Sequence, residues 1–583
     1  MNIIGISAHY HDSACCLIKN GKLVSAVEEE RLSRIKHDNR IPINSFLFCL
    51  EENNIGIGDI DCIAYYEQPE KKISRQLWST MVSKDQNRLL NFLKINVNQA
   101  ENDIREVLGY QGKILFFDHH LSHAASSFHY SGFVESAILT VDGVGEWDTA
   151  TFGYGDQNGI KIFKSNDFPD SIGLLYSTLT SFLGFKVNDG EYKVMGLAPY
   201  GKPTYLARLR KLIHISGECS FELNHKYFNF NNTQHMYTDH LADLLKCEPR
   251  MPESQIYQLH FDIAKSLQCL LEEILLKFAN YLYKIAPSDN LSMAGGVALN
   301  CVANTRILKD GPFKNLFVQP AAGDSGAALG AAVLAYKQLT GKSFSTKLSH
   351  VYLGPSYSHA AISNILLSTP IKYKTDNKEA MLTLAIERLN AGKVLGWFQG
   401  RLEFGPRALG SRSILADPRG NNTRDRINAS VKKRESFRPF APSVLYDEAM
   451  NHFDIDHASP FMLETCQVIS KLKLPAITHV DNSARIQTVS KEDNQLYYEL
   501  ISRFCTKTGC PILLNTSFNL RSEPIVADPI DAIICFLRSE IDTLVLGNYL
   551  IDREDIPDAW YEWYQKSTVK KGDVANHDVY TFI

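Results

Sequence analysis

The sequence predicts an α/β protein with more than one domain and an internal duplication in its first half. With 583 residues the chain is too long for one hydrophobic core, and roughly two to four domains are expected. Runs of strand-like alternation are interleaved with helical apolar periodicity. A strand–turn–strand unit close to the first residue returns after about 130 residues, as in a duplicated fold.

Composition narrows the class of protein further. Hydrophobic residues make up 44% and charged residues 22%, which is typical of a soluble globular protein. No apolar run approaches the roughly 20 residues that span a bilayer, and the chain enters a strand at once, without a secretion signal, so we expect a cytoplasmic protein. A net charge of −4 predicts no nucleic-acid or membrane partner. Twelve cysteines without any C-x-x-C indicate neither zinc fingers nor a disulfide framework.

The first copy of the duplicated unit occupies residues 3–27. Strands are predicted at 3–7 and 14–19, and His11 lies in the polar turn between them. Asn20-Gly21 is typical of a type I′ hairpin and leads into a third strand, which ends at residue 27. The duplication predicts a second polar turn at the equivalent position of the second copy.

The second copy begins at residue 137. Strands are predicted at 137–141, 149–154 and 160–163, with a polar turn at Asp142-Gly143 and a hairpin at Asn158-Gly159. In each copy a polar loop lies between two strands, where backbone N–H groups can cradle a phosphate.

A predicted helix between the two copies contains a pair of histidines. It follows a strand at 113–117, runs over 119–129 with Asp118 as a plausible N-cap, and ends at Gly132. His119 and His123 share one helix face. Such a pair on its own more often belongs to a packed or solvated face, but a strand-ending aspartate in a glycine loop, Asp142, favours a metal site.

Two glycine-containing strand–helix junctions follow a long apolar helical stripe at 258–285. A strand at 291–294 leads to Gly295-Gly296 and a helix containing Asn300, and a strand at 316–319 leads to Gly323-Asp324 and another helix. Glycines at such junctions let a nucleotide approach the backbone, although they often serve close packing alone. The polar loop 188–196, which contains Lys193, is by itself more typical of a surface loop.

The order of these units resembles the duplicated ATPase fold of actin, hexokinase and Hsp70. The motifs His-x-x-x-His, Val-Asp-Gly-x-Gly-Glu, Gly-Gly-Val-Ala-Leu-Asn and Gly-Asp-Ser-Gly resemble the threonylcarbamoyl-transferase branch of that fold, and more closely the O-carbamoyltransferases of the nodulation-factor, cephamycin and tobramycin type. The resemblance implies a divalent metal bound by four residues: His119, His123, Asp142 and Asp324. The metal that the family implies is Fe²⁺. It implies adenylate binding by Gly143, Gly145, Lys193, Gly295, Gly296 and Asn300. His120 and His129 are expected to be structural.

The second half contains a local concentration of positive charge. A boundary is predicted near 341–357, and residues 401–438 then hold ten Lys or Arg against four Asp or Glu. A solvated basic face and a nucleic-acid patch are the alternatives. Because the cations are mainly arginines among Gly-Pro turns and aromatic residues, a fixed phosphate pocket is favoured.

This half resembles the YrdC-like domain of the same carbamoyltransferases, through Gly-Pro-Arg-Ala-Leu-Gly, Val-Lys-x-Arg-Glu-x-Phe-Arg-Pro-Phe-Ala-Pro-Ser and Asn-Thr-Ser-Phe-Asn. The resemblance implies a transfer domain at 1–345 and a domain at 353–583 that makes carbamoyl-AMP. It implies binding of carbamoyl phosphate and Mg²⁺-ATP by Arg407, Lys432, Arg438, Arg485 and Ser517. Ser522 stands where the family commonly has glycine, which leaves the backbone conformation of that loop open.

Taken together, these features predict an ATP-dependent carbamoyltransferase that acts on a hydroxyl group of a small molecule, such as a secondary metabolite or a sugar. His11 is the candidate general base, with orientation of the acceptor as the equal alternative. Three other functions are the alternatives: tRNA threonylcarbamoyl modification, carbamoylation for hydrogenase maturation, and a nucleotide-switched chaperone-like protein. The acceptor and the oligomeric state stay open, a homodimer included, and His₂Asp₂ ligation alone suits iron(II), manganese or zinc.

Overall fold

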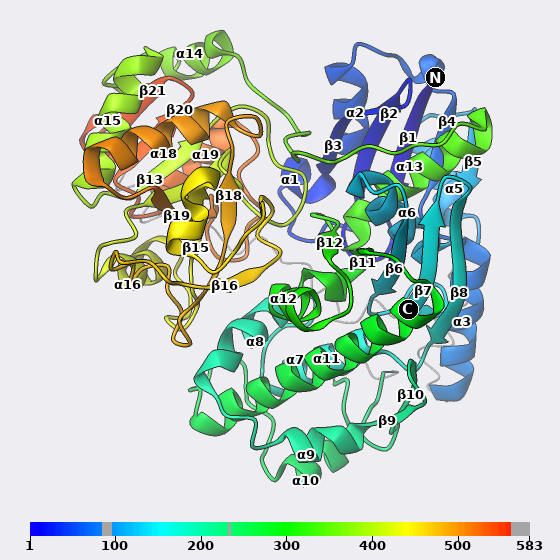
Figure 1. The fold of residues 1–583 in the computed structure, drawn as a ribbon. Coiled ribbons are helices and arrows are strands. Elements are labelled where there is room, and N and C mark those ends of the chain that lie inside the picture. Colours follow the sequence, from blue (N-terminus) through cyan, green and yellow to red (C-terminus); the bar gives the residue numbers. More distant parts are fainter. Residues whose placement is uncertain (84–95, 231–234, 561–583) are drawn as a thin grey trace. The chain divides into compact units, whose positions relative to one another are not determined.

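A computed structural model describes residues 1–83, 96–230 and 235–560 of the chain (Figure 1). The described residues form two compact units. Among the described residues, the first contains Met1–Glu29 and His37–Leu348, and the second contains Glu30–Lys36 together with residues 349–560.

The first sheet of unit 1 has, among the described residues, the strand order β3-β2-β1-β4-β5. Strand β1 pairs antiparallel with β2 and parallel with β4, and β4 pairs parallel with β5. The strands are β1 (Asn2–Ser7), β2 (Ala14–Lys19), β3 (Lys22–Glu28), β4 (Cys62–Tyr65) and β5 (Lys113–Phe116). The turn between β2 and β3 has positive φ at both Asn20 (51°) and Gly21 (77°), as the predicted type I′ hairpin requires.

The second sheet repeats this topology in the order β8-β7-β6-β11-β12. Its strands are β6 (Ser136–Val141), β7 (Asp148–Asp156), β8 (Gly159–Asp167), β11 (Asn290–Ala294) and β12 (Asn315–Val318). In each copy the first strand pairs antiparallel with the second and parallel with the fourth. The duplicated fold of the actin and hexokinase type is therefore confirmed.

One helix follows the fifth strand of each copy. Helix α6 (His119–Ser131) follows β5, and α13 (Asp324–Thr340) follows β12. The two helices pack closely, since a Cβ at Gly330 would lie 1.8 Å from the carbonyl oxygen of Ser122. Helix α6 ends at Gly132 with φ 78°, as the sequence predicts.

The remaining helices of unit 1 connect and cover the sheets. They include α2 (Ile43–Glu52), α3 (Pro69–Ser83), α5 (Gln99–Glu106), α7 (Ile172–Phe182), α8 (Glu191–Leu197), α11 (Gln258–Ile285) and α12 (Cys301–Asp310), whereas α1 (Glu29–Ser33) lies almost entirely in the segment of unit 2. The long apolar stripe at 258–285 forms α11, as predicted, and its apolar face is buried.

Unit 2 is built on a mixed sheet with the order β18-β15-β19-β14-β13-β20-β21 in the described chain. The strands are β13 (Leu395–Phe398), β14 (Arg412–Ala416), β15 (Ala441–Leu445), β18 (Gln487–Val489), β19 (Ile512–Ser517), β20 (Thr543–Leu546) and β21 (Tyr549–Asp552). Helices packed with it include α14 (His359–Leu367), α15 (Lys378–Asn390), α18 (Gln495–Thr508) and α19 (Pro529–Arg538). The YrdC-like assignment of this region stays a prediction.

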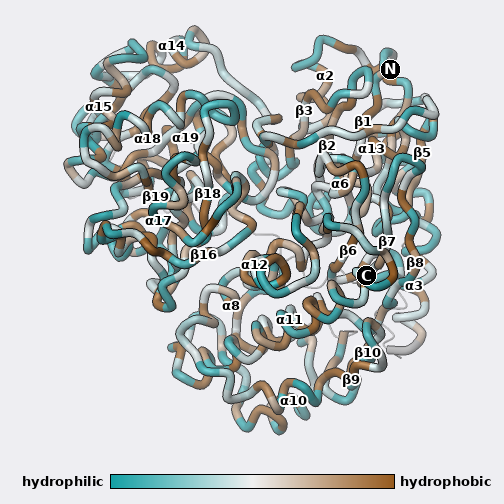
Figure 2. Tube along the Cα trace, viewed as in Figure 1, coloured by the Kyte–Doolittle hydropathy of each residue, from teal (hydrophilic) through white to brown (hydrophobic). Residues whose placement is uncertain are grey.

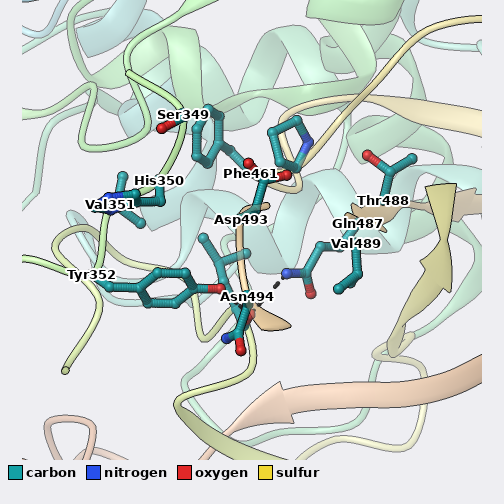
Figure 3. A pocket seen from close by; sticks show the side chains of 12 residues that line it. Ser349, His350, Val351, Tyr352, Phe461, Gln487, Thr488, Val489, Asp493 and Asn494 are labelled. Atoms are coloured by element: carbon teal, nitrogen blue, oxygen red, sulfur yellow. Dashed lines mark hydrogen bonds between the residues drawn. The ribbon is translucent and has the colours of Figure 1, made fainter. Parts of the chain in front are cut away.

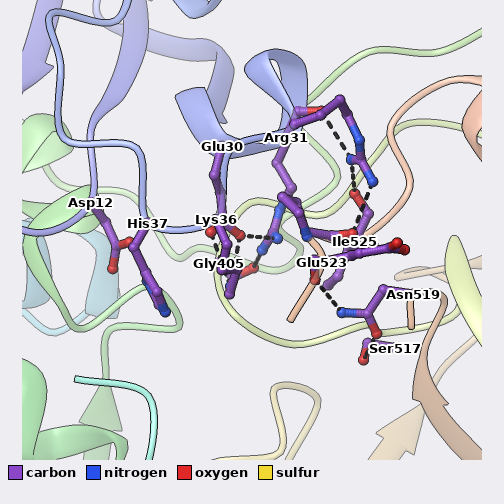
Figure 4. A network of polar contacts seen from close by, with 12 residues as sticks. Asp12, Glu30, Arg31, Lys36, His37, Gly405, Ser517, Asn519, Glu523 and Ile525 are labelled. Atoms are coloured by element: carbon purple, nitrogen blue, oxygen red, sulfur yellow. Dashed lines mark hydrogen bonds and ion pairs between the residues drawn. The ribbon is translucent and has the colours of Figure 1, made fainter. Parts of the chain in front are cut away.

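A short segment from the N-terminal region completes unit 2. Within it, Arg31 donates to the carbonyl oxygen of Gly405 (2.9 Å), and Arg34 donates to those of Pro524 (3.0 Å) and Ile525 (2.6 Å) (Figure 4). The sequence assigned residues 30–36 to the first domain, but in the structure they pack with the second unit. The difference arises because their partners lie hundreds of residues further along the chain.

The apolar residues follow the strands and helices, and hydrophilic residues dominate many of the connecting loops (Figure 2). In the described ranges, none of the helices combines the length and the apolar character needed to cross a bilayer.

Candidate functional site

The four predicted metal ligands meet in the interior of unit 1. His119 and His123 come from α6, Asp142 follows β6, and Asp324 begins α13. The two histidine Nε2 atoms are 3.1 Å apart, and each lies 3.2 Å from Asp142 Oδ2 and 3.7 Å from Asp324 Oδ1. All four side chains are buried, and one ligand atom from each lies within 4.8 Å of the others.

The charges of this cluster are strongly coupled. Burial lowers the pKa of His119, but the hydrogen bond to Asp142 and the charges of Asp324, Asp142 and Glu146 outweigh burial and raise that pKa to about 9. The pKa of His123 is also raised against burial, by Asp142 and Asp324. Burial raises the pKa of Asp142, whereas its bonds to the two imidazoles hold that pKa well below the usual range. Without a metal, the positive charge of the protonated imidazoles therefore balances the negative charge of the carboxylates.

This donor set fits a divalent cation. Asp324 Oδ2 is buried and has no hydrogen-bond partner in the described chain, and the facing Nε2 atoms can bond each other only if one of them is protonated. A cation between them would satisfy all of these atoms, and two imidazoles with two carboxylates suit iron(II), manganese or zinc. His120 and His129 lie apart from this set, since His120 Nδ1 bonds Thr140 Oγ1 (2.6 Å) and His129 Nδ1 bonds the carbonyl oxygen of Phe344 (2.7 Å).

Glu146 holds the first turn of α6 in place. Its two carboxylate oxygens accept from the backbone N–H of His119 (2.9 and 3.1 Å), and Oε1 also accepts from the backbone N–H of Gln68 (2.8 Å). Asp118 occupies the predicted N-cap position with an extended backbone, but its side chain makes no capping bond in the structure as described and instead pairs with Lys71 (2.7 Å). The capping carboxylate comes from a distant loop.

The glycine loops shape the cluster by allowing close approach. Asp142 Oδ1 accepts from the backbone N–H of Gly143 (2.8 Å) and Gly296 (3.0 Å), which leaves Oδ2 facing the histidines. Gly295 has φ +93°, and a Cβ there would lie 2.2 Å from the carbonyl oxygen of Val141. A Cβ at Gly145 would lie 2.9 Å from the rings of His119 and His120. These glycines thus position the cluster, and their contact with an adenylate stays a prediction.

The other two predicted adenylate residues already have protein neighbours. Asn300 caps α12 by accepting from the N–H of Ala303 (3.0 Å), and its amide forms two bonds with that of Gln268 (2.9 and 3.0 Å). Lys193 lies on α8, with Nζ 5.8 Å from the centre of the Phe185 ring.

His11 belongs to a second polar cluster in unit 1. Its Nδ1 lies 2.7 Å from Asp12 Oδ2, and His37 Nδ1 lies 2.9 Å from Asp12 Oδ1. Burial raises the pKa of Asp12, but the two imidazoles outweigh it and hold that pKa well below the usual range. Asp12 and His37 are drawn in Figure 4. These three residues are the second group, among those described, whose geometry could hold a cation.

In unit 2, many residues of the basic concentration serve the fold. Arg412 is fully buried and donates to four carbonyl oxygens, Arg419 pairs with Asp417 (2.6 Å), and Arg426 pairs with Asp542 (2.7 Å). Of these partners, only Asp542 is an acid from outside residues 401–438, and it offsets part of the local excess of positive charge.

Lys432 and Ser517 are brought together. The ammonium of buried Lys432 donates to the Ser517 carbonyl oxygen (2.8 Å), the Asn519 carbonyl oxygen (2.9 Å) and the Asn519 side chain (2.5 Å), and its Nζ lies 3.2 Å from Ser517 Oγ. Burial, with Arg434 and Arg438 nearby, lowers the pKa of Lys432 well below its usual range. Lys432 therefore anchors the loop that carries Ser517.

The other predicted phosphate-binding residues occupy separate elements. Arg438 lies 3.6 Å from Glu435, Arg407 lies between β13 and β14, and Arg485 ends the short strand β17 (Ser483–Arg485). Ser522 has φ 65°, the left-handed region that favours glycine.

A pocket in unit 2 does not match the expected phosphate site (Figure 3). It is lined by His350, Tyr352, Phe461, Asp493 and Asn494, among others, and none of its lining residues is Lys or Arg. A dianionic phosphate would find no cation among them.

The segment that follows β4 contributes to the surroundings of the cluster. The sequence predicts mostly helical structure at 65–110 and indicates no function there; helix α3 confirms the helical structure, and the Tyr66 ring centre lies 5.2 Å from that of His119. A visible signal was Lys72, Arg75, Gln76 and Ser79, polar residues spaced at helical intervals.

Comparison with known proteins matches two family models. The model described as "Carbamoyltransferase N-terminus" matches residues 2–333, and "Carbamoyltransferase C-terminus" matches residues 386–553. Together they cover most of both units.

Three relatives illustrate the range of similarity. An uncharacterized protein, sll1178, from Synechocystis sp. is 42% identical over 95% of this chain and 97% of its own length. Nodulation protein NolNO of Sinorhizobium fredii is 41% identical, with 94% of this chain and 80% of its own covered. The 3'-hydroxymethylcephem-O-carbamoyltransferase of Amycolatopsis lactamdurans is 34% identical, over 50% of this chain and 53% of its own.

Proposed function

Because the chain belongs to the carbamoyltransferase family, we propose that it makes carbamoyl-AMP from carbamoyl phosphate and ATP and transfers the carbamoyl group to a hydroxyl of a small molecule. The names of relatives support an oxygen acceptor: one acts on 3'-hydroxymethylcephem, and another is a nodulation protein. The observation that best supports a transfer centre in unit 1 is the convergence of His119, His123, Asp142 and Asp324.

The activation step is assigned to unit 2. A carbamoyl carbonyl is a poor electrophile because its nitrogen donates electrons into it, and a mixed anhydride with AMP supplies a good leaving group. Phosphate and pyrophosphate both leave when carbamoyl phosphate, ATP and one water become carbamoyl-AMP. Arg407, Arg438 and Arg485 are the proposed phosphate ligands, with Mg²⁺ on the ATP phosphates. Lys432 and Ser517 are proposed to take part in the same site, and Lys432 holds the loop that carries Ser517.

Transfer is assigned to unit 1. The acceptor oxygen attacks the carbamoyl carbon, the bond to the AMP phosphate oxygen breaks, and the hydroxyl proton must leave. His11 is the proposed base, because Asp12 at 2.7 Å fixes its Nδ1 as the protonated nitrogen and leaves Nε2 to accept. In the alternative, His11 only orients the acceptor. His11 would then occupy the same position, but the rate of carbamoyl transfer would not depend on its protonation.

A divalent metal would be held by His119, His123, Asp142 and Asp324. Bound there, it would supply positive charge to oxygens of the activated donor. We propose Fe²⁺ for this site, and a cytoplasmic location for the reaction. A homodimer stays a prediction without structural support.

A direct experiment incubates the protein with ATP, carbamoyl phosphate and a panel of hydroxylated metabolites. The proposal predicts release of pyrophosphate and a mass gain of one carbamoyl group on an acceptor. Absence of pyrophosphate with every acceptor would contradict the activation step.

A further inference from the structure

Helix α3 turns a polar face toward the interior of unit 1. The buried residues of this face are Lys72, Arg75, Gln76, Ser79 and Thr80, whereas the exposed residues include Leu77, Trp78 and Met81. A surface helix normally shows the reverse pattern, because burying polar groups costs free energy unless they gain partners. This stripe therefore indicates a polar group that binds against α3.

Arg75 lies at the centre of the stripe without an acceptor. Arg75 is only 1% exposed, and its Nε, Nη1 and Nη2 atoms have no hydrogen-bond partner in the described residues. The guanidinium lies over the Phe168 ring, 5.5 Å from its centre. The hydroxyls of Ser79 and Tyr66 are likewise buried and unbonded within the described chain. A permanently charged group with several free donors requires an anion that is rich in acceptors.

The carboxylates nearest to this stripe already have partners. Glu67 accepts from the ammonium of Lys72 (2.7 Å), and Glu146 accepts from two backbone N–H groups. Burial lowers the pKa of Arg75, and the charges of Tyr10, Glu67 and Glu146 oppose that shift, so these groups offset part of its charge. None of them accepts a hydrogen bond from Arg75 in the structure as described, so its N–H groups still lack an acceptor.

The stripe begins beside the His119 cluster. Glu146 joins the backbone N–H of Gln68, directly before α3, to that of His119, and the Tyr66 ring lies 5.2 Å from the His119 ring. Helical side chains lean toward the N-terminus, so Arg75 on the second turn leans toward the first turn. Its guanidinium is thus directed toward the transfer centre.

We propose that Arg75, with Tyr66 and Ser79 beside it, forms an oxyanion subsite that binds the phosphate group of the carbamoyl adenylate. A neutral polyol would leave the guanidinium charge only partly compensated, whereas a phosphate supplies both negative charge and several acceptors. The inference rests on the proposed function, because that function supplies the adenylate as the anion.

The first test measures stability without ligands. Arg75→Met removes a buried guanidinium that has no hydrogen-bond acceptor in the described chain, so the unfolding temperature should stay unchanged or rise. Arg250→Met is the matched control: Arg250 is a buried arginine of the same unit whose guanidinium donates to the carbonyl oxygens of Leu183, Ser254 and Gly184. It should lower the unfolding temperature clearly. A loss in Arg75→Met as large as in Arg250→Met would assign Arg75 to the fold and overturn the inference.

The second test measures binding of AMP and of adenosine by calorimetry on the full chain. In the wild type, AMP should bind at least tenfold more tightly than adenosine at one class of site. Arg75→Met should remove that preference, and Arg75→Lys should restore part of it. A preference for AMP that is unchanged in Arg75→Met would overturn the assignment to phosphate.

Pyrophosphate release from ATP and carbamoyl phosphate is measured on the wild-type sample. A wild type that releases none would contradict the proposed function, while the AMP preference would still decide the role of Arg75.

Discussion

At the level of single residues, the hydrogen bond between His11 and Asp12 determines which imidazole nitrogen is available to take a proton. Asp12 occupies Nδ1, and its low pKa keeps it ionised near neutral pH. The sequence identified His11 by its position in a polar turn. It did not indicate that Asp12 also faces His37, because that contact needs the loop 25 residues further on to fold back.

Replacing His11 tests its proposed role. His11→Ala should lower carbamoyl transfer about 10²–10⁴-fold, the usual contribution of general-base catalysis, and leave pyrophosphate release intact. The measurement compares carbamoylated product with pyrophosphate from the same reaction. Transfer at the wild-type rate would remove His11 from the mechanism.

The raised pKa of His119 predicts how pH acts on the metal-free protein. An unfolded histidine titrates near 6.5. Since the folded pKa is higher, about 9, the proton on His119 stabilises the fold fully below pH 6.5, and this stabilisation is lost as pH rises through 9.

Thermal unfolding at pH 6.5 and pH 9 tests this sign. The contribution of His119 to the stability of the metal-free protein should be smaller at pH 9 than at pH 6.5. A divalent metal replaces protons on the imidazoles, so it should raise the unfolding temperature more at pH 9 than at pH 6.5. His129→Gln, which lies outside the cluster, should preserve the effect. An equal metal effect at both pH values would contradict the cluster as the binding site.

At the level of elements, most helices and strands were predictable because their periodicity is local. The strands of both copies, the stripe of α11 and the end of α6 at Gly132 are confirmed within a few residues. The cap of α6 was not predictable, since Glu146 lies 27 residues from His119 in the sequence. The ion-pair partners of the basic concentration were not predictable for the same reason, since Asp542, the partner of Arg426, is remote in the sequence.

Glu146 and Asp118 form a matched pair for testing the cap. Glu146→Ala should cost about 1–2 kcal/mol of the free energy of unfolding, as the loss of a helix cap does, and weaken metal binding by displacing His119. Asp118→Ala removes only an exposed pair with Lys71 and should cost less than about 0.5 kcal/mol. Denaturant unfolding measures both, and a larger loss in Asp118→Ala would contradict the observed cap.

At the level of the whole molecule, the duplication explains where the chemistry lies. The turn after the first strand carries His11 and Asp12 in the first copy and Asp142 in the second. The helix after the fifth strand carries the histidine pair in the first copy and Asp324 in the second. Resemblance to carbamoyltransferases is confirmed by two family models. The packing of residues 30–36 with unit 2 was not predictable, because it depends on tertiary contacts. The spacing of the polar residues of α3 is visible in the sequence, but their burial also depends on tertiary contacts.

The central claim is that one chain carries out two separable reactions, activation in unit 2 and transfer in unit 1. The substitution Asp142→Asn tests this claim most directly. Asparagine can still accept from the N–H groups of Gly143 and Gly296, but it removes the charge that faces the histidines. Pyrophosphate release and carbamoylated product are measured together on the purified variant. We predict pyrophosphate at the wild-type rate with transfer reduced at least a hundredfold; loss of both activities in a folded variant, or retention of transfer, would contradict the claim.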